Sequence, residues 1–560
     1  MNDETAAGLQ FQLRKAGLLL VILASFVLFV FSEGVRFGDA TTYAKQIRLG
    51  ALIEPGHLLW RPLGYVVGHA LNTLGTYSSA LWTLQGLCLA ASVAGVAATY
   101  VLCRQVTSPG IALFVAGFTA VSNGYWFYSF SGCSYTLGIL FQTIALNYAI
   151  KKREATEGWR NAFAAGGFGG LAASAWAPNV LAAPALIVAL FRPTGGSRTP
   201  VRQFLGTGCV VALGYFATFA LPLALAYGCT GSQWRVQPTS SGVTFAQWLS
   251  SSRHGVPVHM GLTQLLRAAL GWAQSVISLS DLGYRLKLWR LAEGAFPVSS
   301  WNLALLLFYG GAVLLAVILL RGRSRLDARA RALTSAAVLA VGLNLAFGIA
   351  WQGTDLERYM PSWPFQMALL ALALNVLWEG ADRTQFISPL FAAVVVLGIV
   401  NWQGTFKPVL DANSYRNAWI TAIRQHASGG DLVVLFGQRK VVIVSPHDEN
   451  FPKINEISDE IEKGGTGWRS VEINEIERTQ SRGGRVFLGD SLFWLDSAPR
   501  DGWSFSENPV PTPRDISEAF MPFKSDTLAF TVGRERVWMA RTGVGPQTDG
   551  EHTFEGRKQE

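Results

Sequence analysis

Charged residues are scarce in this chain: they make up 15% of its 560 residues, whereas 50% of the residues are hydrophobic. Soluble domains carry about 25% charged residues. The composition therefore excludes an ordinary soluble protein and favours a polytopic membrane protein with a polar appendage. The long apolar runs stop near residue 402, and the sequence after this point has the composition of a soluble domain.

Cysteine and histidine are also rare, with five and seven residues, and neither is spaced like a set of metal ligands. The cysteines lie in or at the ends of apolar runs, which indicates packed free thiols rather than a disulfide framework. Cys133 and Cys229 are expected on the same side of the membrane, so a bond between them stays open. No repeat of fixed period is present.

The net charge of +9 does not indicate a nucleic-acid partner. The arginines gather in short loops between apolar segments, which is the pattern that sets membrane orientation. Arg14 and Lys15 put the N-terminus in the cytoplasm. The apolar run that follows is longer than most signal-peptide cores and is expected to remain as an anchor.

The apolar runs and basic loops predict about eleven transmembrane helices. We expect them at 14–32, 78–102, 109–127, 133–150, the two halves of 161–191, 203–228, 301–320, 332–351, 362–379 and 386–402. Residues 57–73 contain His57, Arg61 and His69 and are expected along the interface. If they crossed the bilayer, every later basic loop would switch to the outside.

The predicted fold class is an α-helical polytopic membrane domain with a C-terminal soluble α/β domain. The predicted boundaries are 1–402 for the membrane domain, 403–545 for an extracytoplasmic domain and 546–560 for a disordered tail. Strands are expected at 431–436, 440–444, 485–488 and 527–531, and helices at 411–427 and 454–463. A further amphipathic helix is expected near 261–277, inside a long outer loop.

Three polar groups are expected together on the outer face of the membrane. The first contains Asp39, Glu54, His57 and Arg61, the second runs from Tyr128 to Tyr135, and the third contains Asp355, Glu357, Arg358 and Tyr359. Sugar transfer from a lipid phosphate needs a base for the acceptor hydroxyl and cations for the leaving phosphate. Asp39 and Arg358 suit these two roles, with His57 and Arg61 as helpers.

Structural interpretations of the same residues stay open. Asp39 could cap the helix that begins at Ala40. Arg358 could simply pair with Asp355 or Glu357 and anchor a loop. His57 and Arg61 could anchor the chain at the interface, and Tyr135 could be a packing aromatic.

These motifs resemble the GT-C superfamily of integral-membrane glycosyltransferases, which includes protein O-mannosyltransferases and aminoarabinose transferases. The matching segments are Gly38-Asp39, Glu54–Gly64, Tyr128-Ser129 with Tyr135-x-Leu137, and Glu357-Arg358-Tyr359 with Pro361 close behind. The resemblance covers roughly residues 15–400. It implies that Asp39 is the catalytic base of an inverting, cell-envelope glycosyltransferase in the bacterial inner membrane. The implied partners are a polyprenyl-phosphate sugar, membrane lipid and an acceptor glycan, lipid or protein.

Two departures from the family pattern leave the sugar and the metal requirement open. The family often has a second acidic residue beside the first-loop aspartate, and here the neighbours are Ala40 and Thr41. The glutamate of the family's Glu-x-Tyr pattern is replaced, with Cys133-Ser134 in its place. We expect no cofactor, with a divalent cation left open.

Two other functions compete with the enzyme. A transporter or flippase of lipid-linked saccharides should carry ionisable groups near mid-membrane and paired repeats with broken helices. The sequence has neither. A non-catalytic envelope-assembly protein would tolerate the loss of Asp39.

Overall fold

The computed structural model describes residues 3–31, 38–76, 79–151, 158–191, 200–230, 262–279, 300–350, 356–378, 383–436, 451–457, 467–493, 513–533 and 535–542. The chain divides into two compact units, Met1–Leu410 and Asp411–Glu560. The division lies within one helix, α19 (Lys407–His426). The predicted strand at 440–444, the predicted tail and Asp355 lie outside the described residues.

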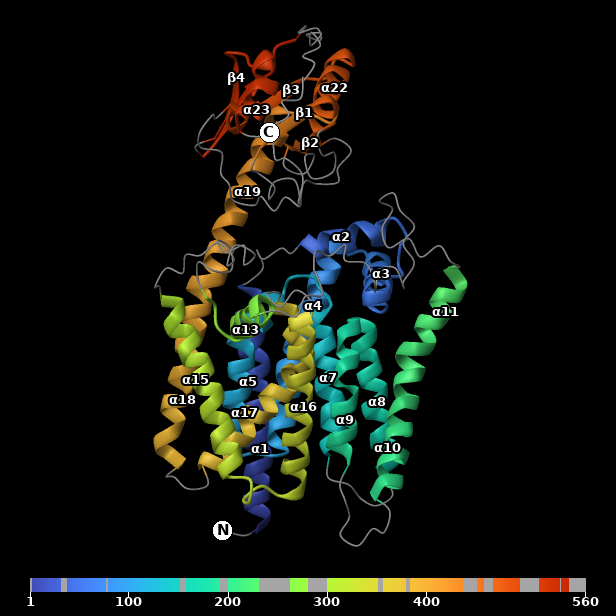
Figure 1. Ribbon diagram of the computed structural model, residues 1–560, viewed down its shortest axis with the longest axis vertical. Helices are drawn as coiled ribbons and strands as arrows, with labels where there is room; N and C mark the ends of the chain where they lie inside the picture. Colours follow the sequence, from blue (N-terminus) through green and yellow to red (C-terminus); the bar gives the residue numbers. More distant parts are fainter. Residues whose placement is uncertain are drawn as a thin grey trace, which may run out of the picture. The chain divides into compact units, whose positions relative to one another are not determined.

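The first unit is a bundle of helices (Figure 1). Its elements are α1 (Asp3–Val30), α2 (Gly38–Arg48), η1 (Pro55–His57), α3 (Trp60–Thr73), α4 (Ala80–Arg104), α5 (Pro109–Val121), α6 (Asn123–Tyr128), α7 (Tyr135–Ile150), α8 (Gly158–Ala175), η2 (Ala177–Ala182), α9 (Ala183–Leu190), α10 (Pro200–Tyr215), η3 (Phe216–Ala220), α11 (Leu221–Thr230), α13 (Leu262–Val276), α15 (Ser300–Arg321), α16 (Ala328–Ala350), η6 (Leu356–Ser362), α17 (Trp363–Trp378), α18 (Arg383–Asn401) and η7 (Trp402–Phe406).

Apolar helices of membrane-spanning length confirm that this is an integral membrane protein. Within the described residues, the helices long and apolar enough to cross a bilayer are Ala80–Arg104, Val201–Ala226, Ala328–Ala350, Leu356–Trp378 and Ser388–Phe406. Shorter apolar helices lie at Ala16–Val30, Pro109–Val121, Tyr135–Ile150, Ala177–Leu190 and Leu305–Arg321. The segment predicted to lie along the interface forms η1 and the 14-residue helix α3, which is too short to span.

The short elements α2, α3 and α13 lie at the end of the bundle opposite the start of α1 (Figure 1). Proline shapes the polypeptide at this end. Pro178 lies at the start of the 3₁₀ turn η2, which joins α8 to α9, and Pro361 lies inside the 3₁₀ turn η6, which precedes α17. Proline cannot donate the backbone hydrogen bond of a continuing α-helix. Both chain segments therefore break here, and the two turns pack against each other.

The core of the bundle is built largely from small residues. Buried alanines line the contacts of α8, α9, α16 and α17. Because alanine and glycine add little bulk, the helix backbones approach closely, as is typical of membrane helix packing. One close contact joins α8 to α10. A Cβ atom added at Gly166 would meet the Val211 carbonyl oxygen.

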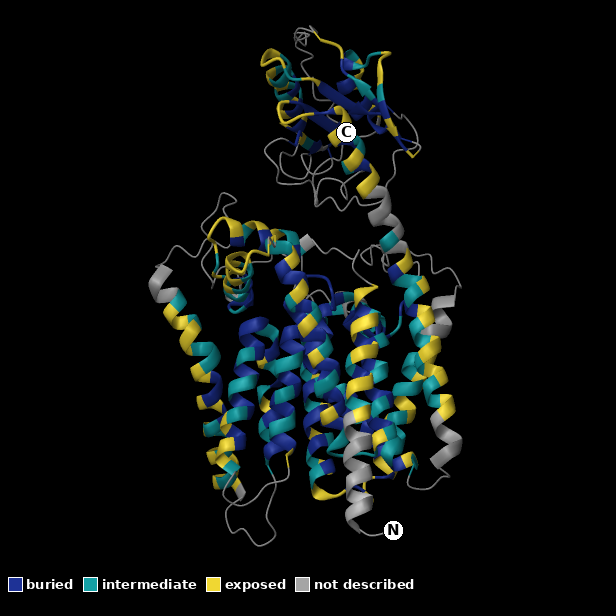
Figure 2. Ribbon diagram, turned by 180° about the vertical axis from the view of Figure 1, so that it is seen from behind, coloured by how far each residue is buried: buried dark blue, intermediate teal, exposed yellow. Residues whose placement is uncertain are grey.

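The second unit contains a five-stranded sheet of order β2-β1-β3-β5-β4. The strands are β1 (Leu432–Leu435), β2 (Lys453–Glu456), β3 (Val486–Gly489), β4 (Leu528–Val532) and β5 (Glu535–Met539). β1 is parallel to β2 and β3, whereas β5 is antiparallel to β3 and β4. The helices of this unit are the end of α19, α22 (Trp468–Ser481) and α23 (Pro513–Phe520). The sheet lies at the buried centre of the unit (Figure 2).

One prediction for this unit was wrong. The segment from residue 454, predicted as a helix, begins inside strand β2, where Val433 and Ile454 are paired. Tertiary pairing with the buried β1 outweighs the weak helical propensity of this short segment. The strand at 535–539 was not predicted.

The contact of α8 with α10 yields a prediction. Gly166→Ala places a methyl group where the Val211 carbonyl stands, so we expect the free energy of unfolding to fall by about 1–3 kcal/mol. Thermal unfolding in detergent measures this change. Gly206→Ala on α10 is the matched control, because nothing lies within 4 Å of an added Cβ atom there. Equal melting temperatures for the two variants would contradict the predicted packing.

Candidate functional site

The polar groups predicted to converge lie at the α2 and α3 end of the bundle. Asp39 is in the first turn of α2, and Tyr135 begins α7. The Tyr135 hydroxyl donates a hydrogen bond to Asp39 Oδ2 at 3.4 Å. Tyr135 therefore does more than pack, although its ring also contacts Trp176 at the hairpin tip, with 5.0 Å between ring centroids.

Asp39 lies in a mostly desolvated, electronegative setting. Burial is the first cause that raises the pKa of its carboxyl, and the negative charges of Glu357 and Glu54 raise it further. The charge of His57 and the hydrogen bond from Tyr135 act in the opposite direction. The net shift of the pKa is upward, so this carboxylate binds a proton more readily than an exposed aspartate.

Each carboxylate beside Asp39 has its own cation. Glu54 pairs with Arg61, whose side chain is 6% exposed. Arg61 also donates to the Ala51 carbonyl and lies over the Tyr43 ring, 5.5 Å from its centroid. Arg61 is thus buried in protein rather than extended along a lipid interface.

Glu357 pairs with Arg358 in the same way. Both residues belong to η6, both are 9% exposed, and their charged atoms are 3.2 Å apart. The next residue fixes the turn, since the Tyr359 hydroxyl donates to the Ala268 carbonyl of α13 at 2.8 Å. From the sequence, Arg358 could pair with Glu357 and anchor this loop, and that ion pair is present. Asp355, the other predicted member of this group, lies outside the described residues.

His57 joins three parts of the site. Its Nδ1 lies 2.7 Å from the Ser134 hydroxyl oxygen and 3.1 Å from the Ala175 carbonyl oxygen. Its ring packs between Tyr43 and Tyr135, at centroid distances of 5.3 and 6.1 Å. The ring is therefore held by α2, by the start of α7 and by the end of α8.

The segment 129–134 is a buried loop that supports this arrangement. Its backbone is pinned by the Trp60 indole, which donates to the Gly132 carbonyl at 3.1 Å, and by the Cys88 thiol, which donates to the Cys133 carbonyl at 3.3 Å. Gly132 has a φ of +83°, and an added Cβ atom would lie 3.0 Å from the Ala40 methyl carbon. Only glycine fits both requirements, so the loop presses directly against the helix turn that carries Asp39.

One residue of the site was missed by the sequence reasoning. Ser134 was inside a recognised motif, but no local pattern reveals that it contacts His57, 77 residues earlier.

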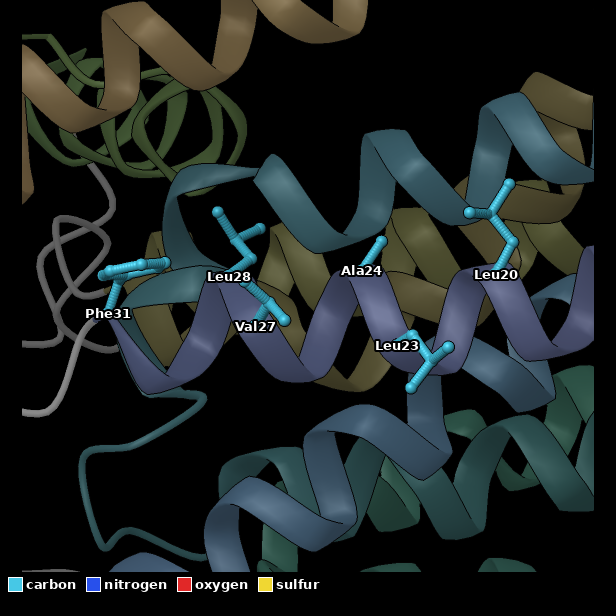
Figure 3. Close-up of a pocket in the computed structure, with 6 residues that line it drawn as sticks. All are labelled: Leu20, Leu23, Ala24, Val27, Leu28 and Phe31. Carbon is cyan, nitrogen blue, oxygen red and sulfur yellow. The ribbon is translucent and has the colours of Figure 1, made fainter.

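A separate groove runs along α1 (Figure 3). It has a volume of about 550 Å³ and is lined by Leu20, Leu23, Ala24, Val27, Leu28 and Phe31. With only apolar side chains, it offers nothing to orient a polar substrate. Such a lining suits a hydrocarbon chain.

In the described part of the chain, no group of three His, Cys, Asp or Glu side chains could hold a metal ion. The two carboxylates whose charges raise the pKa of Asp39 are each paired with an arginine.

No protein-family model matches the chain, and no curated protein matches it. Solved structures are similar in fold. ArnT from Cupriavidus metallidurans bound to undecaprenyl phosphate aligns with a TM-score of 0.53 at 11% identity, covering 94% of this chain and 99% of that one. Its apo state aligns with a TM-score of 0.51, also at 11% identity and with the same coverage. The apo oligosaccharyltransferase of Archaeoglobus fulgidus aligns with a TM-score of 0.45 at 13% identity, over 86% of this chain and 69% of that one.

The ion pair of Arg61 with Glu54 yields a prediction about folding. Arg61→Met leaves Glu54 without its cation, so we expect the free energy of unfolding to fall by about 2–4 kcal/mol. Thermal unfolding in detergent measures the loss. Arg48→Met is the control, because Arg48 is exposed at the end of α2. If Arg61→Met lowers the melting temperature no more than Arg48→Met does, the site geometry is contradicted.

Proposed function

Because the chain has the GT-C membrane fold, we propose that it is a membrane glycosyltransferase that uses a polyprenyl-phosphate sugar. The reaction transfers the sugar to an acceptor hydroxyl on the outer face of the membrane. Asp39 is the general base, and Arg358 binds the donor phosphate. The acceptor is a glycan, a lipid or a protein.

One observation carries this proposal: the ion pair of Glu357 and Arg358 lies close enough to Asp39 for the charge of Glu357 to raise the pKa of its carboxyl. The charged atoms of Glu357 and Arg358 are 3.2 Å apart. The proposed base and the proposed phosphate ligand therefore belong to one electrostatic cluster. The guanidinium fork can contact two phosphate oxygens, which a lysine cannot do.

The chemistry follows from these positions. The acceptor oxygen attacks the anomeric carbon while the bond from that carbon to the phosphate oxygen breaks. Asp39 takes the hydroxyl proton, and its raised pKa favours this step. The polyprenyl phosphate leaves with the bonding electron pair, and Arg358 stabilises the charge that develops on it. Attack from the face opposite the leaving group inverts the configuration.

The fold also offers an apolar surface for the prenyl chain of the donor. The similar ArnT was solved with undecaprenyl phosphate bound, and a lipid carrier of this type is our proposed donor for this chain. The apolar groove on α1 offers one surface for its prenyl chain. We further propose about eleven spans within a catalytic domain at 1–402, a cytoplasmic N-terminus and an extracytoplasmic domain at 403–545, in a bacterial inner membrane.

The distribution of buried ionic side chains favours an enzyme over a transporter or flippase. Among the described residues of the first unit, the buried ionic side chains are His57, Arg61, Glu357 and Arg358. All four belong to the elements at one end of the bundle. A substrate pathway across the bilayer would need polar groups near mid-membrane as well.

Replacing the base tests the proposed reaction. For Asp39→Asn we expect transfer to fall about 10²–10⁴-fold, because the amide cannot accept the proton. The assay uses purified protein in liposomes with a panel of radiolabelled undecaprenyl-phosphate sugars and extracted envelope acceptors. In the unmodified protein, transfer should fall as the pH drops through the raised pKa of Asp39, where the base becomes protonated.

Asp327→Asn is the control for this substitution. Asp327 accepts a hydrogen bond from the Ala330 amide near the start of α16, and asparagine keeps an oxygen for it. Full transfer by Asp39→Asn, or an equal loss in both variants, would rule out the proposed base.

Replacing the phosphate ligand tests the donor site. Arg358→Lys keeps a positive charge but loses the planar fork, so we expect undecaprenyl phosphate to bind about tenfold more weakly, with a larger loss for Arg358→Met. Tryptophan fluorescence titration measures the affinity. Arg323→Met, an exposed residue after α15, should bind as the unmodified protein does. Unchanged affinity in both Arg358 variants contradicts the role.

A further inference from the structure

The Asp39 carboxylate accepts one hydrogen bond from the described residues, and the donor is Tyr135. The Tyr135 hydroxyl lies 3.4 Å from Oδ2. Catalytic hydrogen bonds are often this long before the substrate binds. Asp39 itself is half-buried, so its side chain is not sealed away from the site. With Oδ2 engaged, Oδ1 is the carboxylate oxygen that remains available to a substrate hydroxyl.

The Tyr135 ring is held by aromatic rings from three other segments. Tyr135 is the first residue of α7 and is 2% exposed. Its ring meets Tyr128 of α6 and Trp176 after α8 edge to face, at centroid distances of 4.6 and 5.0 Å. The His57 ring lies 6.1 Å away in a similar orientation. Aromatic pairs prefer this geometry. Packing therefore restrains the phenol ring and, with it, the position of its hydroxyl.

A phenol suits the task of orienting a base. It donates one hydrogen bond and carries no charge when it is protonated. Its bond to an ionised carboxylate is stronger than its bond to a neutral carboxyl, so it favours the form of Asp39 that can accept a proton. Burial is the largest cause that raises the pKa of Asp39, and the hydrogen bond from Tyr135 lowers it.

We propose that Tyr135 is the residue that positions the base: its hydroxyl holds Oδ2 of Asp39, so that Oδ1 takes the proton of the acceptor hydroxyl. In the transfer step the proton moves from the acceptor oxygen to Oδ1, while the tyrosine keeps its own hydrogen. Tyr135 acts through Asp39 and not on the substrate. The catalytic meaning of the contact rests on the proposed function, but the contact itself does not.

Tyr135→Phe tests this role, because it keeps the ring and its packing and removes the hydroxyl. In purified full-length protein in liposomes, we expect kcat to fall about tenfold. The KM for the radiolabelled undecaprenyl-phosphate sugar should stay within about twofold, because binding of the donor is not affected. The acidic limb of the pH profile should move up by about one unit, since Asp39 loses a bond that lowers its pKa.

The groups around Asp39 that can titrate or carry charge are unchanged in this variant. They are Glu54, His57, Glu357, Tyr43 and Cys133. The shift of the acidic limb therefore reports the missing hydroxyl.

Two further variants separate this role from a general effect on packing. Tyr125→Phe is the matched control: it removes a buried hydroxyl that donates to the Ser92 carbonyl at 2.7 Å, and kcat and the acidic limb should stay unchanged. Adding Tyr135→Phe to Asp39→Asn should cause no further loss of transfer, because Tyr135 acts only through the carboxylate.

Infrared difference spectroscopy gives a readout that does not depend on transfer. It follows the carbonyl stretch of the protonated Asp39 carboxyl, which is identified by its absence in Asp39→Asn. Tyr135→Phe should move this titration to higher pH by the same amount as the acidic limb. If Tyr135→Phe does not fold, 3-fluorotyrosine at position 135 is a stronger donor and should move the titration to lower pH.

An infrared titration that neither substitution moves would overturn the proposal. So would a loss of transfer that Tyr125→Phe reproduces, or one that Tyr135→Phe still causes in the Asp39→Asn background. A shifted infrared titration in a protein that transfers no sugar would instead overturn the proposed function and leave the contact of Tyr135 with Asp39 in place.

Discussion

The site places an acidic side chain, Asp39, where water is scarce. Burial and two neighbouring acidic residues all raise the pKa of Asp39. Isolated charges in such a place are too costly to retain, so the fold supplies positive partners close by. Arg61 pairs with Glu54, Arg358 pairs with Glu357, and His57 opposes both acids. The short elements α2, η1, α3 and η6 carry most of these groups.

Much of the membrane domain was predictable because apolar runs of fixed length and basic loops follow from the bilayer itself. The amphipathic helix expected near 261–277 is α13, and the segment expected along the interface forms α3. The motifs also pointed to Asp39, His57 and Arg358, whose roles stay predictions. Their contacts could not be predicted, because the contact of His57 with Ser134 joins residues far apart in the chain and depends on how α7 and α8 pack.

The second unit was harder to predict for a related reason. Its strands are four or five residues long, and so short a segment carries little signal of its own. The residues of β2 were mistaken for a helix because their identity as a strand comes from pairing with β1. A solved structure of similar fold shares only 11% identity with the chain.

A structure of the protein in a lipid nanodisc with undecaprenyl phosphate tests the central claim most directly. The account predicts a phosphate within hydrogen-bond distance of the Arg358 guanidinium, on the side that faces the Asp39 carboxyl. A phosphate bound elsewhere on the bundle, or an Asp39 carboxyl separated from Arg358 by intervening helices, would contradict it.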